Sequence, residues 1–115
     1  ENRQLAYDDF AAVARSLATT GVAEPSRIAV RGGSNGGLLV GNAYVQYPEL
    51  FGACVCAVPL LDMKRYSHLL AGASWMAEYG DPDTEDWTFL KNYSPYHNID
   101  LTKKFPPMLM TTSTK

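Results

Sequence analysis

The chain alternates between helix-like and strand-like stretches of apolar residues. Its first pattern is helical, because apolar residues recur at spacings of 4, 3 and 4, at Ala6, Phe10, Val13 and Leu17. Gly21 then offers a helix stop. Residues 38–47 are apolar or small on nearly every face, as in a buried helix, and Pro48 ends that stretch.

Three short apolar runs between these stretches have the character of buried strands. They cover residues 28–30, 54–58 and 107–112. Residues 62–79 are polar and aromatic, and we expect helical pieces there. Asp83 is expected to cap a helix over residues 84–93, with Asp86 in its first turn. Continuously apolar strands that alternate with helices predict an α/β fold with three parallel strands and flanking helices.

Composition limits what such a fold could do. The chain has 115 residues and a mass of 12.6 kDa, so residues 1–115 form at most one domain. Its net charge of -2 gives no electrostatic basis for binding nucleic acid or an anionic membrane. No apolar run approaches the ~20 residues of a membrane-spanning helix. We therefore expect neither nucleic acid nor membrane as a partner.

The chain contains two cysteines, Cys54 and Cys56, in one of the apolar runs. We expect their side chains on opposite faces of a strand and unpaired. They form neither a disulfide framework nor a structural zinc site, so no metal is expected. Free thiols fit a reducing compartment, and we expect the cytoplasm, with the periplasm as the alternative.

Gly32-Gly33-Ser34-Asn35-Gly36 matches the G-x-S-x-G pattern of a nucleophile elbow, between an expected strand and an expected helix. In that setting Ser34 is the candidate nucleophile, and the backbone N–H of Asn35 is a candidate oxyanion donor. A phosphate-binding loop would need Lys where Leu38 stands, and a dinucleotide motif would need Gly in place of Ser34. A flexible turn with an incidental serine is the remaining alternative.

An elbow serine needs an acid and then a histidine, in that chain order. His68 and His97 are the only histidines, and both precede the strand after which the acid belongs. We therefore expect neither to be the catalytic base. The sequence carries a nucleophile without its partners, and we expect it to be a fragment of a longer enzyme.

At a closer level, the chain resembles the central part of the peptidase domain of the prolyl oligopeptidase family. The resemblance rests on the extended Gly32–Val40 motif and on four further segments: residues 48–52, 61–63, Trp75 with 78–80, and 93–98. It implies a partial α/β-hydrolase fold and a serine peptidase that cleaves short peptides after proline through an acyl-enzyme on Ser34. It also implies that Asn35 serves the oxyanion hole and the pocket wall, that Trp75 stacks on the substrate proline, and that Leu60 and Tyr79 help to enclose it. No cofactor is implied.

The resemblance also implies what residues 1–115 do not contain. The catalytic Asp would follow Lys115, an Arg and the His would come later, a second oxyanion donor would lie upstream of Glu1, and the β-propeller is absent. We therefore expect the isolated chain to be inactive and to self-associate through open sheet edges. The alternatives are an esterase or an acylaminoacyl-peptidase-like relative on the same scaffold, or a non-catalytic α/β module.

Overall fold

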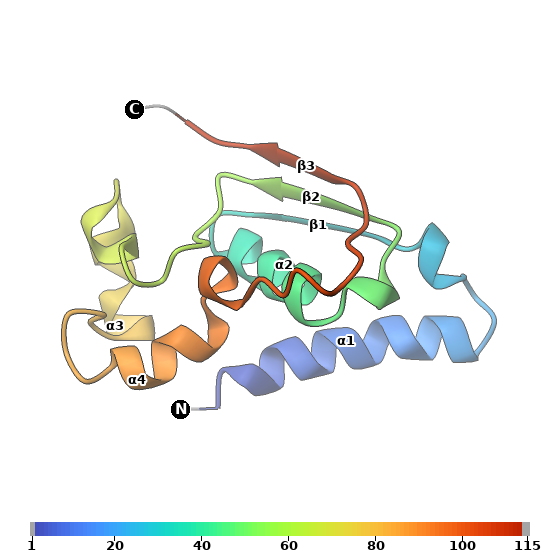
Figure 1. Ribbon diagram of the computed structural model, residues 1–115, viewed down its shortest axis with the longest axis horizontal. Helices are drawn as coiled ribbons and strands as arrows, with labels where there is room; N and C mark the ends of the chain where they lie inside the picture. Colours follow the sequence, from blue (N-terminus) through green and yellow to red (C-terminus); the bar gives the residue numbers. More distant parts are fainter. Residues whose placement is uncertain (1, 114–115) are drawn as a thin grey trace.

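A three-stranded parallel sheet organises the chain (Figure 1). In the computed structural model, which describes residues 2–113, the strands are β1 (Ala29–Gly33), β2 (Ala53–Ala57) and β3 (Met108–Thr111). They lie side by side in the order β1-β2-β3, with Ala29 opposite Ala53 and Cys54 opposite Met108. The predicted α/β fold with three parallel strands is confirmed.

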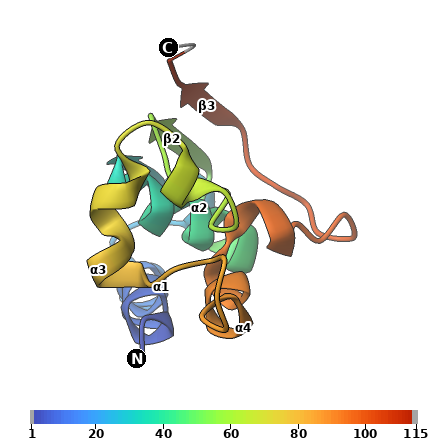
Figure 2. The same cartoon turned by 90° about the vertical axis from the view of Figure 1, so that its left-hand side faces the viewer.

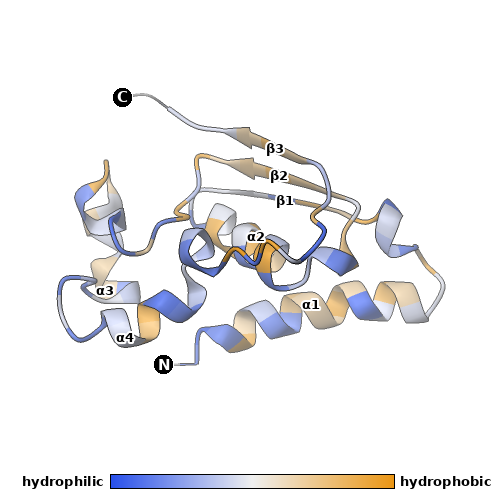
Figure 3. Ribbon diagram, in the orientation of Figure 1, coloured by the Kyte–Doolittle hydropathy of each residue, from blue (hydrophilic) through white to orange (hydrophobic). Residues whose placement is uncertain are grey.

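Two helices form layers on one side of this sheet. Helix α2 (Asn35–Gln46) follows β1 directly and lies against the sheet, and α1 (Gln4–Thr19) lies beyond α2 (Figures 1 and 2). Apolar residues gather in β2, β3 and α2, whereas α1 mixes polar and apolar residues (Figure 3). The two helices are joined by a 2.6 Å hydrogen bond from Gln4 Nε2 to Gln46 Oε1.

The main core fills the space between the sheet, α2 and α1. It contains Ala11, Ala14, Val30, Val40, Ala43, Leu50, Phe51, Cys54 and Cys56. The two cysteines are free and buried. They lie on the same face of β2, so the expectation of opposite faces was wrong, because alternate residues of a strand share a face.

The buried side of α1 differs from the predicted stripe. The buried residues are Tyr7, Ala11 and Ala14, whereas Val13 is 61% exposed and Ala6 is also exposed. Phe10 and Leu17 are only partly buried. Large apolar side chains suggested the stripe, but the contact is made by small alanines, which allow close packing, and by a tyrosine ring.

Residues 58–107 contain short helices and turns that pack around a second, aromatic-rich core. The α-helical pieces are α3 (Met76–Tyr79) and α4 (Trp87–Leu90), accompanied by 3₁₀ helices of three or four residues. This core contains Tyr7, Leu38, Met63, Tyr66, Tyr79, Leu90 and Tyr93. The expected helical pieces over residues 62–79 are confirmed.

The expected helix over residues 84–93 is shorter, and Asp83 does not cap it. The α-helical part begins at Trp87, after Asp86. The Asp83 carboxylate instead lies 2.5 Å from His68 Nε2, and Asp86 accepts a hydrogen bond from the backbone N–H of Asp81. These carboxylates organise turns rather than a helix N-terminus.

Candidate active site

Ser34 occupies a sharp turn between β1 and α2. Its backbone angles are φ 54° and ψ −119°, a region that residues with a Cβ rarely adopt. The turn is held by hydrogen bonds from Ser34 N–H to Ala57 O at 3.0 Å and from Gly37 N–H to Ser34 O at 2.9 Å. These bonds hold Ser34 in its strained conformation, and its side chain is exposed at the end of β1.

Close approach of β1 and α2 allows the turn to form. A Cβ on Gly32 would lie 2.1 Å from the Gly36 carbonyl oxygen, so only glycine fits there. A Cβ on Gly36 would meet nothing within 4 Å. Gly37, outside the five-residue motif, is equally restricted, since its Cβ would lie 2.6 Å from that of Pro59. Within this turn, the glycines that matter sterically are therefore Gly32 and Gly37.

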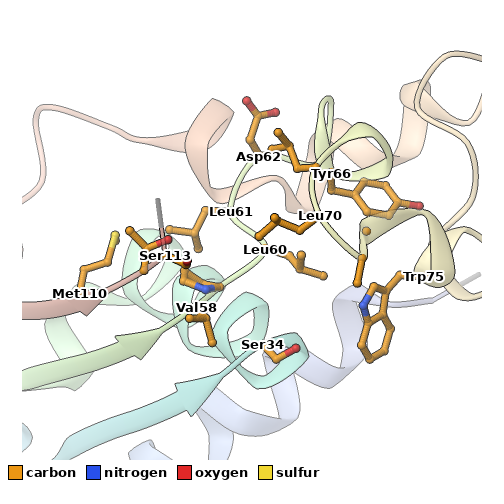
Figure 4. Close-up of a pocket in the computed structure, with 15 residues that line it drawn as sticks. Ser34, Val58, Leu60, Leu61, Asp62, Tyr66, Leu70, Trp75, Met110 and Ser113 are labelled. Atoms are coloured by element: carbon orange, nitrogen blue, oxygen red, sulfur yellow. The ribbon is translucent and has the colours of Figure 1, made fainter. Parts of the chain in front are cut away.

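An apolar cavity of about 570 Å³ opens beside Ser34 (Figure 4). Ser34 follows β1, Val58 follows β2 and Thr112 follows β3, so the cavity lies beyond the carboxyl ends of all three strands. This is where parallel α/β sheets bind ligands. Figure 4 shows Leu60 and Trp75 on the wall beside Ser34.

A second strained residue lies on the cavity wall. Val58 has a φ of 39° although it is β-branched and precedes Pro59. Its N–H donates to Thr111 O at 2.7 Å, and its side chain is 54% exposed. Strained backbone at both Ser34 and Val58 marks this edge of the sheet as the functional one.

Tyr79 and Asn35 are in contact, but neither lines this cavity. The Tyr79 hydroxyl donates a hydrogen bond to Asn35 Oδ1, and the ring is 2% exposed within the second core. Burial raises the pKa of Tyr79 above its ordinary value, although the nearby Arg3 guanidinium opposes that shift. The phenol therefore stays protonated at neutral pH and remains a donor. Its ring centroid lies 6.5 Å from that of Trp75, so Tyr79 supports the cavity wall from behind.

The two histidines have partners away from Ser34. His68 pairs with Asp83, and His97 Nδ1 lies 2.7 Å from the hydroxyl of buried Ser94. Asp62 lies at the cavity, but its carboxylate accepts hydrogen bonds from the backbone N–H groups of Lys64 and Arg65. Within residues 2–113, no cluster of potential ligands could hold a metal ion, and no helix is long and apolar enough to cross a bilayer.

Several residues at the site were not predicted from the sequence. Val58 is the last residue of the strand predicted over residues 54–58, and Pro59 follows it directly, so the end of that strand could have marked both. Leu69 and Leu70, in an irregular loop, and Met110, on β3, carry no local signal. Nor does Arg3, which donates to the Tyr79 hydroxyl at 2.5 Å across 76 positions of sequence.

An exposed serine held in a strained strand-to-helix turn, above an apolar cavity at the carboxyl edge of a parallel sheet, is characteristic of the α/β-hydrolases. Within that class, the chain belongs to the prolyl oligopeptidase family, whose model matches residues 1–115. The resemblance inferred from the motifs is thereby confirmed.

Relatives of known sequence and structure agree. An uncharacterized peptidase of Rickettsia prowazekii is 49% identical over 112 residues, which are 96% of this chain and 16% of the relative. A prolyl oligopeptidase of Dendrothele bispora is 42% identical over 115 residues, covering 98% of this chain and 16% of the relative. A post-proline cleaving enzyme from Rickettsia typhi has a similar structure, with a TM-score of 0.91 and 49% identity over 96% of this chain and 16% of that one. The chain thus spans about one sixth of the length of these relatives.

Proposed function

We propose that this chain is the nucleophile-bearing part of a serine peptidase that cleaves peptides on the carboxyl side of proline. The observation that carries the proposal is the strained Ser34 turn beside the cavity lined by Leu60 and Trp75. Relatives described as prolyl oligopeptidases and as a post-proline cleaving enzyme support the choice of substrate. Prolyl oligopeptidase B from Galerina marginata, a structural relative, was solved bound to a 25mer macrocyclization substrate, which supports a peptide as the ligand.

In the proposed reaction, Ser34 Oγ attacks the carbonyl carbon of the prolyl residue. The hydroxyl proton passes to a general base, and the carbonyl oxygen becomes an oxyanion. The N–H of Asn35, in the first turn of α2, has no acceptor within its helix and is available to that oxyanion. Collapse of the intermediate expels the amine and leaves an acyl-enzyme on Ser34, which water hydrolyses.

The general base is proposed to come from residues outside the described range, because His68 and His97 are paired elsewhere. Triad members act as a unit, so a chain without the base would lose most of the rate enhancement. We therefore propose that residues 1–115 alone are inert. A reducing compartment also remains a proposal, supported by the two free thiols.

Mass spectrometry with a fluorophosphonate probe tests the nucleophile. The intact protein that carries this sequence should gain one adduct, mapped to Ser34, and Ser34→Ala should abolish both the adduct and the hydrolysis of a proline chromogenic peptide. Isolated residues 1–115 should take no adduct. Hydrolysis that survives Ser34→Ala would instead favour a non-catalytic role for the glycine-rich turn.

Trp75→Ala tests the proline pocket. A flat, rigid indole face suits a pyrrolidine ring, so we expect a roughly ten- to hundred-fold loss of kcat/KM on proline substrates and a smaller loss on simple esters. Trp87→Ala is the matched control, because Trp87 packs on His97 with ring centroids 5.0 Å apart and does not line the cavity. Equal losses on both substrate types would favour an esterase or an acylaminoacyl-peptidase-like enzyme.

A further inference from the structure

A chain of hydrogen bonds leads from the start of α1 to the candidate oxyanion turn. The Arg3 guanidinium donates through Nη2 to the Tyr79 hydroxyl at 2.5 Å, and that hydroxyl donates to Asn35 Oδ1. The Arg3 Cζ also lies 4.7 Å from the centroid of the Tyr79 ring. Three segments far apart in the sequence therefore meet at one phenol.

Because both bonds run in the same direction, the bond from Arg3 strengthens the bond from Tyr79 to Asn35. A phenol oxygen that accepts from a cation becomes a stronger donor through its own hydrogen, because neighbouring hydrogen bonds polarise one another. Tyr79 is 2% exposed, so water has little access to the hydroxyl that the two bonds share. Arg3 thus strengthens the bond that fixes the Asn35 side chain, and with it the first residue of α2.

We propose that Arg3 is a positioning residue, which acts through Tyr79 to hold Asn35 and its backbone N–H in place for the oxyanion. The inference rests on the proposed function, because it assigns Asn35 the role of oxyanion donor. Arg3 itself lies on the far side of Tyr79 from Asn35 in this chain of bonds and touches no reacting atom.

A simpler role for Arg3 would be its ion pair with Glu78, at 2.8 Å. The Glu78 side chain is 38% exposed, and partly solvated pairs of this kind contribute little. Glu78→Gln removes the charge of that pair while leaving the bond from Arg3 to Tyr79. The two roles therefore predict different outcomes for Arg3 and Glu78 variants.

The test measures, in the intact protein, the rate of fluorophosphonate labelling of Ser34 and kcat/KM on a proline peptide. Arg3→Met and Tyr79→Phe should each slow labelling roughly ten-fold, since a small misplacement of a catalytic donor has a cost of this order. The loss should fall on kcat more than on KM. Arg3→Lys should recover most of the rate, and Glu78→Gln should change it less than two-fold.

The double variant provides the decisive comparison. If Arg3 acts through the Tyr79 hydroxyl, Arg3→Met should cause no further loss in a Tyr79→Phe background. Effects that multiply, or unchanged labelling by folded Arg3→Met, would overturn the proposal. Should Arg3→Met fail to fold, Tyr79→Phe retains the ring, and unchanged labelling by that variant overturns the proposal equally.

Arg15→Met is the matched control. Arg15 lies on α1, which Arg3 directly precedes, and it also lies over a tyrosine ring, with its Cζ 5.2 Å from the centroid of Tyr47. It has no bond to Tyr79 or Asn35, so labelling should be unchanged. Labelling by the fluorophosphonate depends on Ser34 and the oxyanion site and does not depend on proline. A protein that labels at Ser34 but does not cleave proline peptides would therefore refute the proposed function. The labelling rates of the Arg3 and Tyr79 variants would still test this inference.

Discussion

At the scale of single residues, steric space separates glycines that the motif treats alike. Gly32 and Gly36 occupy the two glycine positions of G-x-S-x-G, yet a Cβ would clash only at Gly32. The sequence motif requires glycine at both positions. Only the short distance from Gly32 to the Gly36 carbonyl shows that Gly32 is the restricted one, and this distance arises when β1 and α2 pack together.

Gly32→Ala and Gly36→Ala are therefore expected to differ. The first should lower the free energy of unfolding by about 1–3 kcal/mol or more, because the added methyl group must displace backbone. The second adds a methyl group to a helical position with open space and should be neutral or stabilising by up to about 1 kcal/mol. Urea unfolding compares them, and a large loss with Gly36→Ala would contradict the steric assignment.

Buried Tyr66 predicts a dependence of stability on alkaline pH. Burial, with a smaller effect of the Asp81 and Asp86 carboxylates, raises the pKa of its phenol from 10.0 to about 12. The folded protein thus keeps a proton that the unfolded chain loses above pH 10. The stabilisation is complete below pH 10 and is lost between about pH 10 and 12, to the extent of about 3 kcal/mol.

Tyr66→Phe should flatten this part of the pH profile, because it removes the titrating hydroxyl. It also removes the hydrogen bond to Gly80 O, so stability at pH 8 should fall. Urea unfolding from pH 8 to 12 gives the slope. Tyr96→Phe, at a ring that is 57% exposed, is the control, and an equal flattening in that variant would refute the assignment to Tyr66.

At the scale of elements, α1 shows where periodicity was informative and where it was not. Apolar spacing indicated a helix, and a helix is present from Gln4 to Thr19. The spacing did not identify its buried face. Hydropathy favours Val13 over Ala11 for burial, whereas close packing in the main core favours the smaller residue.

A reciprocal pair of substitutions tests this face. Ala11→Val adds methyl groups at a site that is 0% exposed and should cost about 1–3 kcal/mol of unfolding free energy. Val13→Ala, at a side chain that is 61% exposed, should change it by less than about 0.5 kcal/mol. Thermal and urea unfolding report both values, and the opposite order would restore the predicted stripe.

The helix predicted over residues 84–93 shows a different limit of local pattern. Asp83 and Asp86 are residue types that favour helix N-termini, but they favour turns for the same reason. Whether each carboxylate caps a helix or holds a turn depends on its hydrogen-bond partner, which can lie in another segment, as His68 does for Asp83. Local sequence contains no information about those partners.

At the scale of the whole molecule, the sheet has unpaired edges among the described residues. β1 and β3 are its outer strands, and Leu109 on β3 is 61% exposed. Open edges and exposed apolar strand residues favour pairing with another chain. We therefore predict that isolated residues 1–115 self-associate.

Leu109→Lys should reduce this association, because a charged side chain on an edge strand opposes strand pairing. Sedimentation velocity over a range of concentrations measures the effect. Val22→Lys, at a loop residue that is 71% exposed and outside the sheet, is the control for added charge. A monomer at all concentrations without any substitution would contradict the prediction.

The sequence by itself determined the parallel α/β sheet, the candidate nucleophile and the family, because each depends on residues close together in the chain. Strand and helix periods are local, and so is the glycine-flanked serine. The tertiary structure alone decided that Tyr79 lies behind the wall of the cavity beside Ser34, and that Arg3 reaches Tyr79. These relations join residues up to 76 positions apart, and only the packing of the sheet, helices and loops places them in contact.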